Sequence, residues 1–145
     1  MKKKVYLTGY EQQTIEEFIR KIEEAGIERI VDVRELPLSR KKGFSKNSLK
    51  IQLAKHGISY VHIRELGTPK ALRRDLKEKG DYLKFFKQYR IHIRGKHIEL
   101  QKLINMASTE ILGIMCFEKD CELCHRTIIG DKILKMDPSL EVITL

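Results

Sequence analysis

Short apolar runs alternate along this chain with segments whose apolar residues recur every three or four positions. The apolar runs are rich in β-branched residues and too short for helices, which is typical of buried strands in a parallel sheet. They predict five strands, at residues 5–8, 29–34, 59–63, 110–116 and 141–145. The alternation of strands with helical segments predicts an α/β fold.

The helical segments carry start and stop signals. Thr14 and Glu17 have the spacing of a capping box, in which each side chain binds a backbone N–H group of the other residue. Gly26 fits the end of that helix. Further helices are predicted at residues 45–57, near 82–89 and 98–107, and at 124–136. We therefore predict a single domain over residues 1–145 with three layers, a mostly parallel sheet and helices on both of its faces.

This architecture predicts where polar residues meet, because the residues that follow parallel strands lie at the same carboxyl edge of the sheet. In this chain the residues at or after predicted strand ends include Thr8, Asp32, Arg34, Gly67 and Cys116. Residues 124–126 would join them at the start of a helix, where backbone N–H groups and the helix dipole favour anions. The sequence therefore predicts a polar crevice at this edge.

The chain is basic, since 29 Lys and Arg against 20 Asp and Glu give a formal net charge of +9 over 145 residues. Such a charge favours encounter with nucleotides, phosphorylated metabolites or nucleic acid. Basic residues cluster at residues 34–46 and 64–74. Two basic groups, Arg40-Lys41-Lys42 and Arg73-Arg74, would track a phosphate backbone, and the aromatic Phe44 beside the first group would stack on a base. Nucleic-acid binding is therefore an alternative to small-molecule binding.

No segment approaches the roughly 20 apolar residues that a membrane-spanning helix needs. The N-terminal residues also lack the long apolar region of a secretory signal. We therefore expect a cytoplasmic protein with no membrane partner. The three cysteines all fall within residues 116–124, and an odd number in one cluster does not resemble the framework of a secreted disulfide protein.

The cysteine cluster contains the candidate catalytic residues. Cys124, at the start of a helix and close to Arg126, would have its thiolate stabilised by the helix dipole and the positive charge. His125 or Glu118 would then move protons for this nucleophile, with Cys116 in support. The guanidinium of Arg126 also offers forked donors to an anionic group.

Other interpretations of the cluster remain open. Cys116, Cys121, Cys124 and His125 are four candidate zinc ligands. The C-x-x-C sequence at residues 121–124 is also found in thiol-redox proteins. A purely structural role would suit small cysteines at a buried strand end equally well. A phosphatase loop is excluded, because the spacing from Cys121 to Arg126 is too short to cradle a phosphate.

Four motifs along nearly the whole chain fit one family pattern. They are Thr8-Gly9, Asp32-Val33-Arg34 followed by Pro37 and Ser39, Leu66-Gly67, and a late signature Cys116-x-Glu118…Cys124-His125-Arg126. On these motifs the chain resembles the domain of unknown function 488 family. The adjacency of Thr8 and Gly9 departs from the family pattern, and Cys121 is additional to it. The resemblance implies an α/β fold and a shared pocket, and it brings no established reaction.

We therefore predict a crevice for an anionic ligand that contains a phosphate or a nucleotide, with catalysis as an open question. The alternative is a nucleic-acid-binding module whose cysteine cluster is structural or binds zinc. No cofactor or resident metal is assigned. The candidate catalytic residues are Cys124, His125, Glu118 and Cys116. The candidate ligand-binding residues are Arg126, Arg34, Asp32, Thr8, Arg40 and Gly67.

Overall fold

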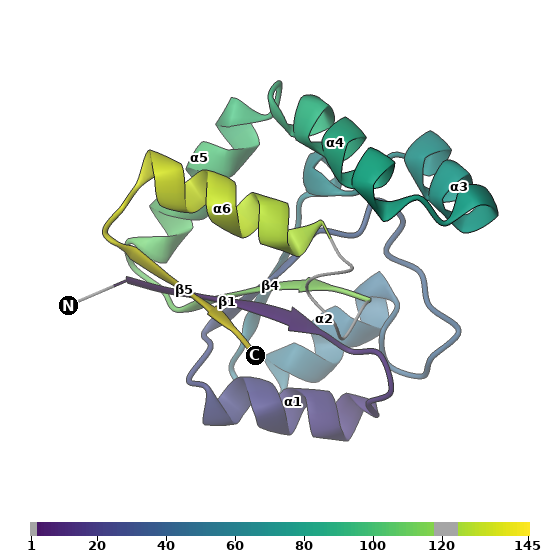
Figure 1. The fold of residues 1–145 in the computed structure, drawn as a ribbon. Coiled ribbons are helices and arrows are strands. Elements are labelled where there is room, and N and C mark those ends of the chain that lie inside the picture. Colours follow the sequence, from purple (N-terminus) through teal and green to yellow (C-terminus); the bar gives the residue numbers. More distant parts are fainter. Residues whose placement is uncertain (1–2, 118–124) are drawn as a thin grey trace.

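Five parallel strands form one sheet with helices on both faces in the computed structural model, which describes residues 3–117 and 125–145 (Figure 1). The strands are β1 (Lys3–Gly9), β2 (Arg29–Asp32), β3 (Ser59–His62), β4 (Leu112–Cys116) and β5 (Leu140–Thr144). The helices are α1 (Ile15–Glu24), α2 (Lys46–Ala54), α3 (Lys70–Lys79), α4 (Tyr82–Ile93), α5 (His97–Ala107) and α6 (Arg126–Met136), with a 3₁₀ helix at Arg64–Leu66. The predicted α/β class is confirmed, and all the described strand pairings are parallel.

The strand order β3-β2-β4-β1-β5 places β4 between β1 and β2. The connections from β1 to β2 and from β2 to β3 run toward one edge of the sheet, whereas the later connections run toward the other. Because βαβ crossovers are right-handed, the two directions put their helices on opposite faces. Accordingly, α1 and α2 cover one face, and α4, α5 and α6 cover the other (Figure 1).

The central strands supply side chains to an apolar core on each face of the sheet. Val31 of β2 and Ile114 of β4 belong to the core beneath α5 and α6. Their neighbours Ile30 and Met115 belong to the core beneath α1 and α2. β4 is buried along its whole length, as expected for a central parallel strand with both faces covered.

The capping box predicted for the first helix is confirmed. The Thr14 side chain accepts a hydrogen bond from the Glu17 backbone N–H, and the Glu17 side chain accepts one from the Thr14 backbone N–H. The apolar face of α1 is buried, as its spacing predicts; it comprises Ile15, Phe18, Ile19 and Ile22. Gly26 follows the helix with a φ of +75°, a conformation that glycine adopts without steric cost.

The helix α3 lies where the sequence pattern predicts no element. None of its residues is fully buried, and its apolar face is short, with Leu72 and Leu76 as its two large apolar residues. It begins after Pro69 and ends at Gly80, which has a left-handed φ of 65°. None of the helices in residues 3–117 and 125–145 is long and apolar enough to cross a membrane.

Candidate functional site

A pocket of about 420 Å³ lies at the carboxyl ends of β1, β2 and β4. The neighbouring strands β1 and β4 are followed by helices on opposite faces, so their loops diverge and leave room between them. The pocket brings together three of the predicted site residues, Arg34, Cys116 and His125. Its described lining residues are Tyr10, Arg34, Glu35, Leu36, Leu38, Ser39, Thr68, Arg73, Leu76, Phe85, Cys116, Phe117 and His125.

A buried ion pair forms the wall of this pocket that follows β2. Asp32, the last residue of β2, is fully buried and Arg34 is 7% exposed. Arg34 donates from Nε to Asp32 Oδ1 at 2.9 Å and from Nη2 to Asp32 Oδ2 at 2.7 Å. The backbone N–H of Arg34 also donates to Asp32 Oδ1, at 3.0 Å. Two parallel charge-assisted hydrogen bonds make this a bidentate pair with a fixed geometry.

Aromatic residues and a backbone carbonyl complete the surroundings of the pair. Arg34 Nη1 donates to the Tyr10 hydroxyl at 3.0 Å and to the Phe44 carbonyl at 2.7 Å. Tyr60 donates to Asp32 Oδ2 at 2.6 Å. Burial alone would lower the pKa of Arg34, but its hydrogen bonds and proximity to Asp32 raise that pKa overall. Burial and the Asp32 charge also raise the pKa of Tyr60. Arg34 therefore stays charged, with most of its donors directed to protein atoms.

The Phe44 ring is not available to stack on a base. It is fully buried and stacks on Tyr10, with ring centroids 4.2 Å apart and planes 10° from parallel. The sequence-based expectation that Phe44 offers a stacking surface beside Arg40 is therefore wrong, because the loop turns the ring into the core. Arg40 itself is exposed and is not among the described residues that line the pocket.

Two histidines hold the backbone that follows β2. His125 Nε2 lies 2.9 Å from the Val33 carbonyl, and His62 Nε2 lies 2.6 Å from the Arg34 carbonyl. Because a carbonyl only accepts, each Nε2 carries the proton. Burial lowers the pKa of His125 to about 4, the hydrogen bond to Val33 opposes this effect, and the charge of Arg126 adds to it. At pH 7 His125 is therefore a neutral donor that fixes the pocket wall.

Arg73 of α3 supplies the second guanidinium of the pocket, which the sequence grouped only with a basic cluster. Its Nη1 donates to the Thr68 carbonyl at 2.7 Å and lies 3.3 Å from Glu35 Oε1. The other carboxylate oxygen of Glu35 accepts from the Lys70 backbone N–H at 3.2 Å, at the start of α3. The two contacts with Glu35 attach α3 to the segment after β2. Nothing local in the sequence signals them, since the partners lie 35 or more residues apart.

Several predicted ligand-binding residues lie away from the pocket lining. Arg126 and Thr8 are fully buried, and the Thr8 hydroxyl has no hydrogen-bond partner among the described residues. Gly67 packs against the segment after β2, where a Cβ atom at its position would lie 2.3 Å from the Glu35 backbone nitrogen. Gly67 therefore shapes the pocket edge by close backbone approach, for which glycine is required.

The cysteine cluster is described only at its ends. Cys116 lines the pocket and is disulfide-bonded, so in this state its sulfur is not a thiolate nucleophile. The other predicted members, Glu118, Cys121 and Cys124, lie outside the described residues. Within residues 3–117 and 125–145, no group of three or more His, Cys, Asp and Glu side chains could hold a metal ion. The zinc and C-x-x-C hypotheses depend on residues outside that part of the chain.

Comparison with protein families matches residues 14–133 to the family described as Domain of unknown function DUF488. The matched range runs from the N-cap of α1 into α6, and it contains every described residue of the pocket lining except Tyr10. Comparison with curated proteins and with solved structures gives no match. Since the family pattern spans most of the chain, the protein belongs to the DUF488 family.

Proposed function

We propose that this protein binds a small anionic ligand, one with a phosphate or a carboxylate group, in the pocket at the carboxyl edge of the sheet. The observation that carries the proposal is the pocket itself, which has a volume of about 420 Å³ and two guanidinium groups in its wall. Small-molecule sites typically have about 300–1,000 Å³ and occur where the helices after neighbouring parallel strands diverge.

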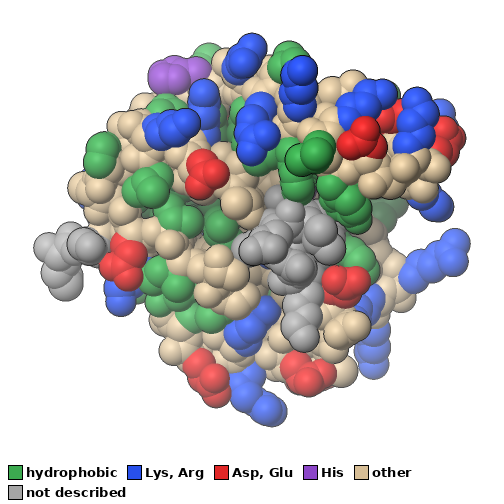
Figure 2. Space-filling view, in the orientation of Figure 1, with side chains coloured by type: hydrophobic (Ala, Val, Ile, Leu, Met, Phe, Trp, Pro, Cys, Tyr) green, Lys and Arg blue, Asp and Glu red, His purple; other side chains and the backbone are tan. Residues whose placement is uncertain are grey.

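Arg73 is the residue best suited to the ligand's charge. Its side chain is 40% exposed, and its ion pair with Glu35 has an N–O distance of 3.3 Å. Partly exposed ion pairs contribute little net stability, so the guanidinium can take up a ligand anion without disrupting the fold. Arg34, in the segment that follows β2, adds a second positive charge to the pocket, although the negative charge of Asp32 largely balances it. Figure 2 shows further Lys and Arg side chains over the helices above this region, which favours approach of anions.

We further propose that the cysteine signature, Cys116-x-Glu118…Cys124-His125-Arg126, carries out a reaction on the bound ligand. Two members of the signature, Cys116 and His125, line the pocket, which supports a role for the signature at the ligand. A nucleophilic Cys124 with proton transfer by His125 or Glu118 remains our hypothesis for such a reaction. Binding is the function that the described residues support directly.

The experiment is calorimetric titration with inorganic phosphate, pyrophosphate and nucleoside monophosphates, compared between Arg73→Ala and Arg74→Ala. Both variants remove one positive charge from α3, but only Arg73 lines the pocket. A hydrogen bond to a charged group contributes about 1.5–3 kcal/mol, so we expect Arg73→Ala to weaken binding by about 10-fold or more. Arg74→Ala should change affinity less than about 3-fold, through screened long-range attraction.

Two outcomes would overturn the proposal. One is the absence of saturable binding of any of these anions to the unmodified protein. The other is an equal loss in Arg73→Ala and Arg74→Ala with a steep dependence on salt. Equal losses would mean that anions bind a diffuse basic surface, as expected for the nucleic-acid-binding alternative.

A further inference from the structure

Three exposed apolar side chains lie together at the same pocket. Leu36 is 58% exposed, Leu38 is 65% exposed and Phe117 is 46% exposed, and all three line it. Leu76 of α3 and Phe85 of α4 add further apolar lining. Large apolar side chains that are left in water at one concave site typically mark the place where a ligand or a partner binds.

We propose that the ligand carries an aromatic ring beside its anionic group, and that the ring packs on Phe117 between Leu36 and Leu38. This inference rests on the proposed function, because it names the chemical class of the anion that the pocket takes. The pocket volume of about 420 Å³ suits a single small molecule. A nucleoside monophosphate is one ligand of this class.

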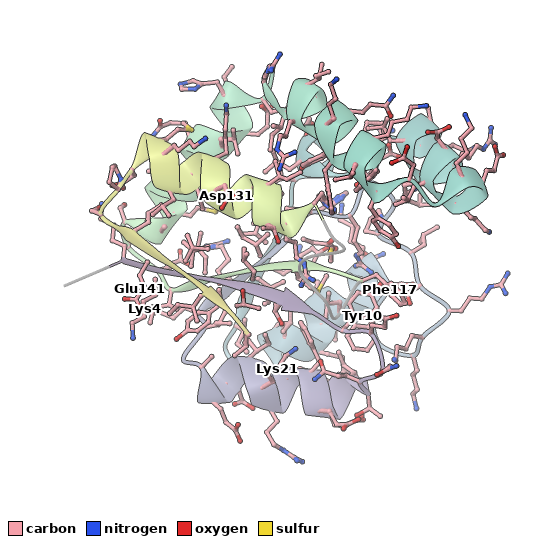
Figure 3. All side chains as sticks on the ribbon, viewed as in Figure 1. Lys4, Tyr10, Lys21, Phe117, Asp131 and Glu141 are labelled. Carbon is pink, nitrogen blue, oxygen red and sulfur yellow. The ribbon has the colours of Figure 1, made fainter. Side chains whose placement is uncertain are left out.

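The arrangement of the aromatic residues supports the assignment of the ring to Phe117. Tyr10 and Phe117 lie beside each other at the carboxyl ends of β1 and β4 (Figure 3), with ring centroids 5.4 Å apart and planes at 84°. Tyr10 is 2% exposed and already stacks on Phe44. Phe117 has an edge contact with Tyr10 as its one ring contact among the described residues. It is therefore the ring at this site with surface left for a ligand.

The polar groups at the site explain why an apolar ligand without charge would be a poorer fit. The guanidinium groups of Arg34 and Arg73 line the same pocket as Phe117. Arg73 is 40% exposed, and a partly exposed cation that an apolar group covers loses hydration without gaining a hydrogen bond. A ligand with a ring joined to a phosphate or carboxylate can place its anionic group on the guanidiniums and its ring on the apolar side chains.

The test compares ligands that share a phosphate and differ in the ring. Two matched pairs are AMP against ribose 5-phosphate, and phenyl phosphate against methyl phosphate, each titrated into the whole protein by calorimetry. We expect the member with the ring to bind about 10-fold more tightly or better, which is the scale of stacking between a base and an aromatic side chain. Phe117→Ala should reduce this preference to less than about 3-fold.

Ile98→Ala is the control variant, because Ile98 is a large apolar residue that is 70% exposed and is not among the described lining residues. It should keep the full preference for the ring. Equal binding within each pair would overturn the aromatic assignment and leave anion binding standing. Loss of the preference in both variants would overturn the role of Phe117. Failure of all four compounds to bind would overturn both proposals.

Discussion

His125 should make the stability of this fold sensitive to mild acid. Its ring is 6% exposed, donates to the Val33 carbonyl at 2.9 Å and contacts the Tyr89 ring edge-on at a centroid distance of 5.1 Å. Burial lowers its pKa from 6.5 to about 4. Between pH 6.5 and pH 4 this histidine is protonated in the unfolded chain but not in the folded chain. The free energy of unfolding therefore decreases as the pH falls.

The size of the effect follows from the pKa difference. A shift of the pKa from 6.5 to about 4 corresponds to a maximum of about 3–4 kcal/mol, at about 1.4 kcal/mol for each pH unit. The stabilisation is fully present above the unfolded pKa and is lost progressively down to the folded pKa. Between pH 7 and pH 5 the loss in the free energy of unfolding should be about 2 kcal/mol.

Urea unfolding at pH 7, 6 and 5 measures this directly, with His125→Gln as the variant that cannot titrate. From pH 7 to pH 5, the free energy of unfolding of the variant should fall by about 2 kcal/mol less than that of the unmodified protein. The carboxylates contribute equally to the pH dependence of both proteins, so the difference reports His125. His56→Gln is the matched control, since His56 is an exposed histidine 3.1 Å from Glu23. Replacing this exposed side chain should change the free energy of unfolding at pH 7 by less than about 0.5 kcal/mol. The same acid sensitivity with and without His125 would refute the reasoning.

Two substitutions test other parts of the site by the free energy of unfolding in urea. Gly67→Ala places a Cβ atom 2.3 Å from the Glu35 backbone nitrogen and should lower the free energy of unfolding by about 1–3 kcal/mol. Gly95→Ala is the control, because a Cβ atom there has no other atom within 4 Å, and it should change the free energy of unfolding by less than about 0.5 kcal/mol. Similar values for the two alanines would contradict the close approach. Asp32→Asn leaves a buried guanidinium uncompensated and should cost about 3–5 kcal/mol. Glu110→Gln, in a partly exposed ion pair with Arg29, should cost less than about 1 kcal/mol. A small effect at Asp32 would show that water reaches the buried pair.

The sequence predicted the elements that bury an apolar face and missed the one that does not. The spacing of Ile15, Phe18 and Ile22 predicts α1 because all three side chains point into the core. The connection before α4 contains α3, whose residues stay partly or fully in water and whose large apolar residues are two leucines, Leu72 and Leu76. So short an apolar face is difficult to distinguish from a loop. Helix propensity and contacts with Glu35 hold α3 in place, and those contacts depend on the folded chain.

The site was predictable where it depends on strand ends, and it was not predictable where it depends on long-range packing. Arg34 and Cys116 meet because parallel strands end at a common edge. Arg73 joins them through the unpredicted α3. Arg126 follows the predicted strand–helix junction, but the start of α6 buries its side chain completely. Spacing alone does not decide whether a charged side chain at such a junction faces a cavity or the core.

The position of β4 in the sheet also has a consequence for how the chain acquires its structure. β1 and β2 do not pair with each other, because each pairs with β4, which begins at Leu112. During synthesis, β1 and β2 therefore lack their shared neighbour until β4 has left the ribosome. Contacts so distant in sequence form slowly, and exposed strand edges invite association in the meantime. The pocket, which spans those strands, forms only after β4 has been synthesised and has paired with both of them.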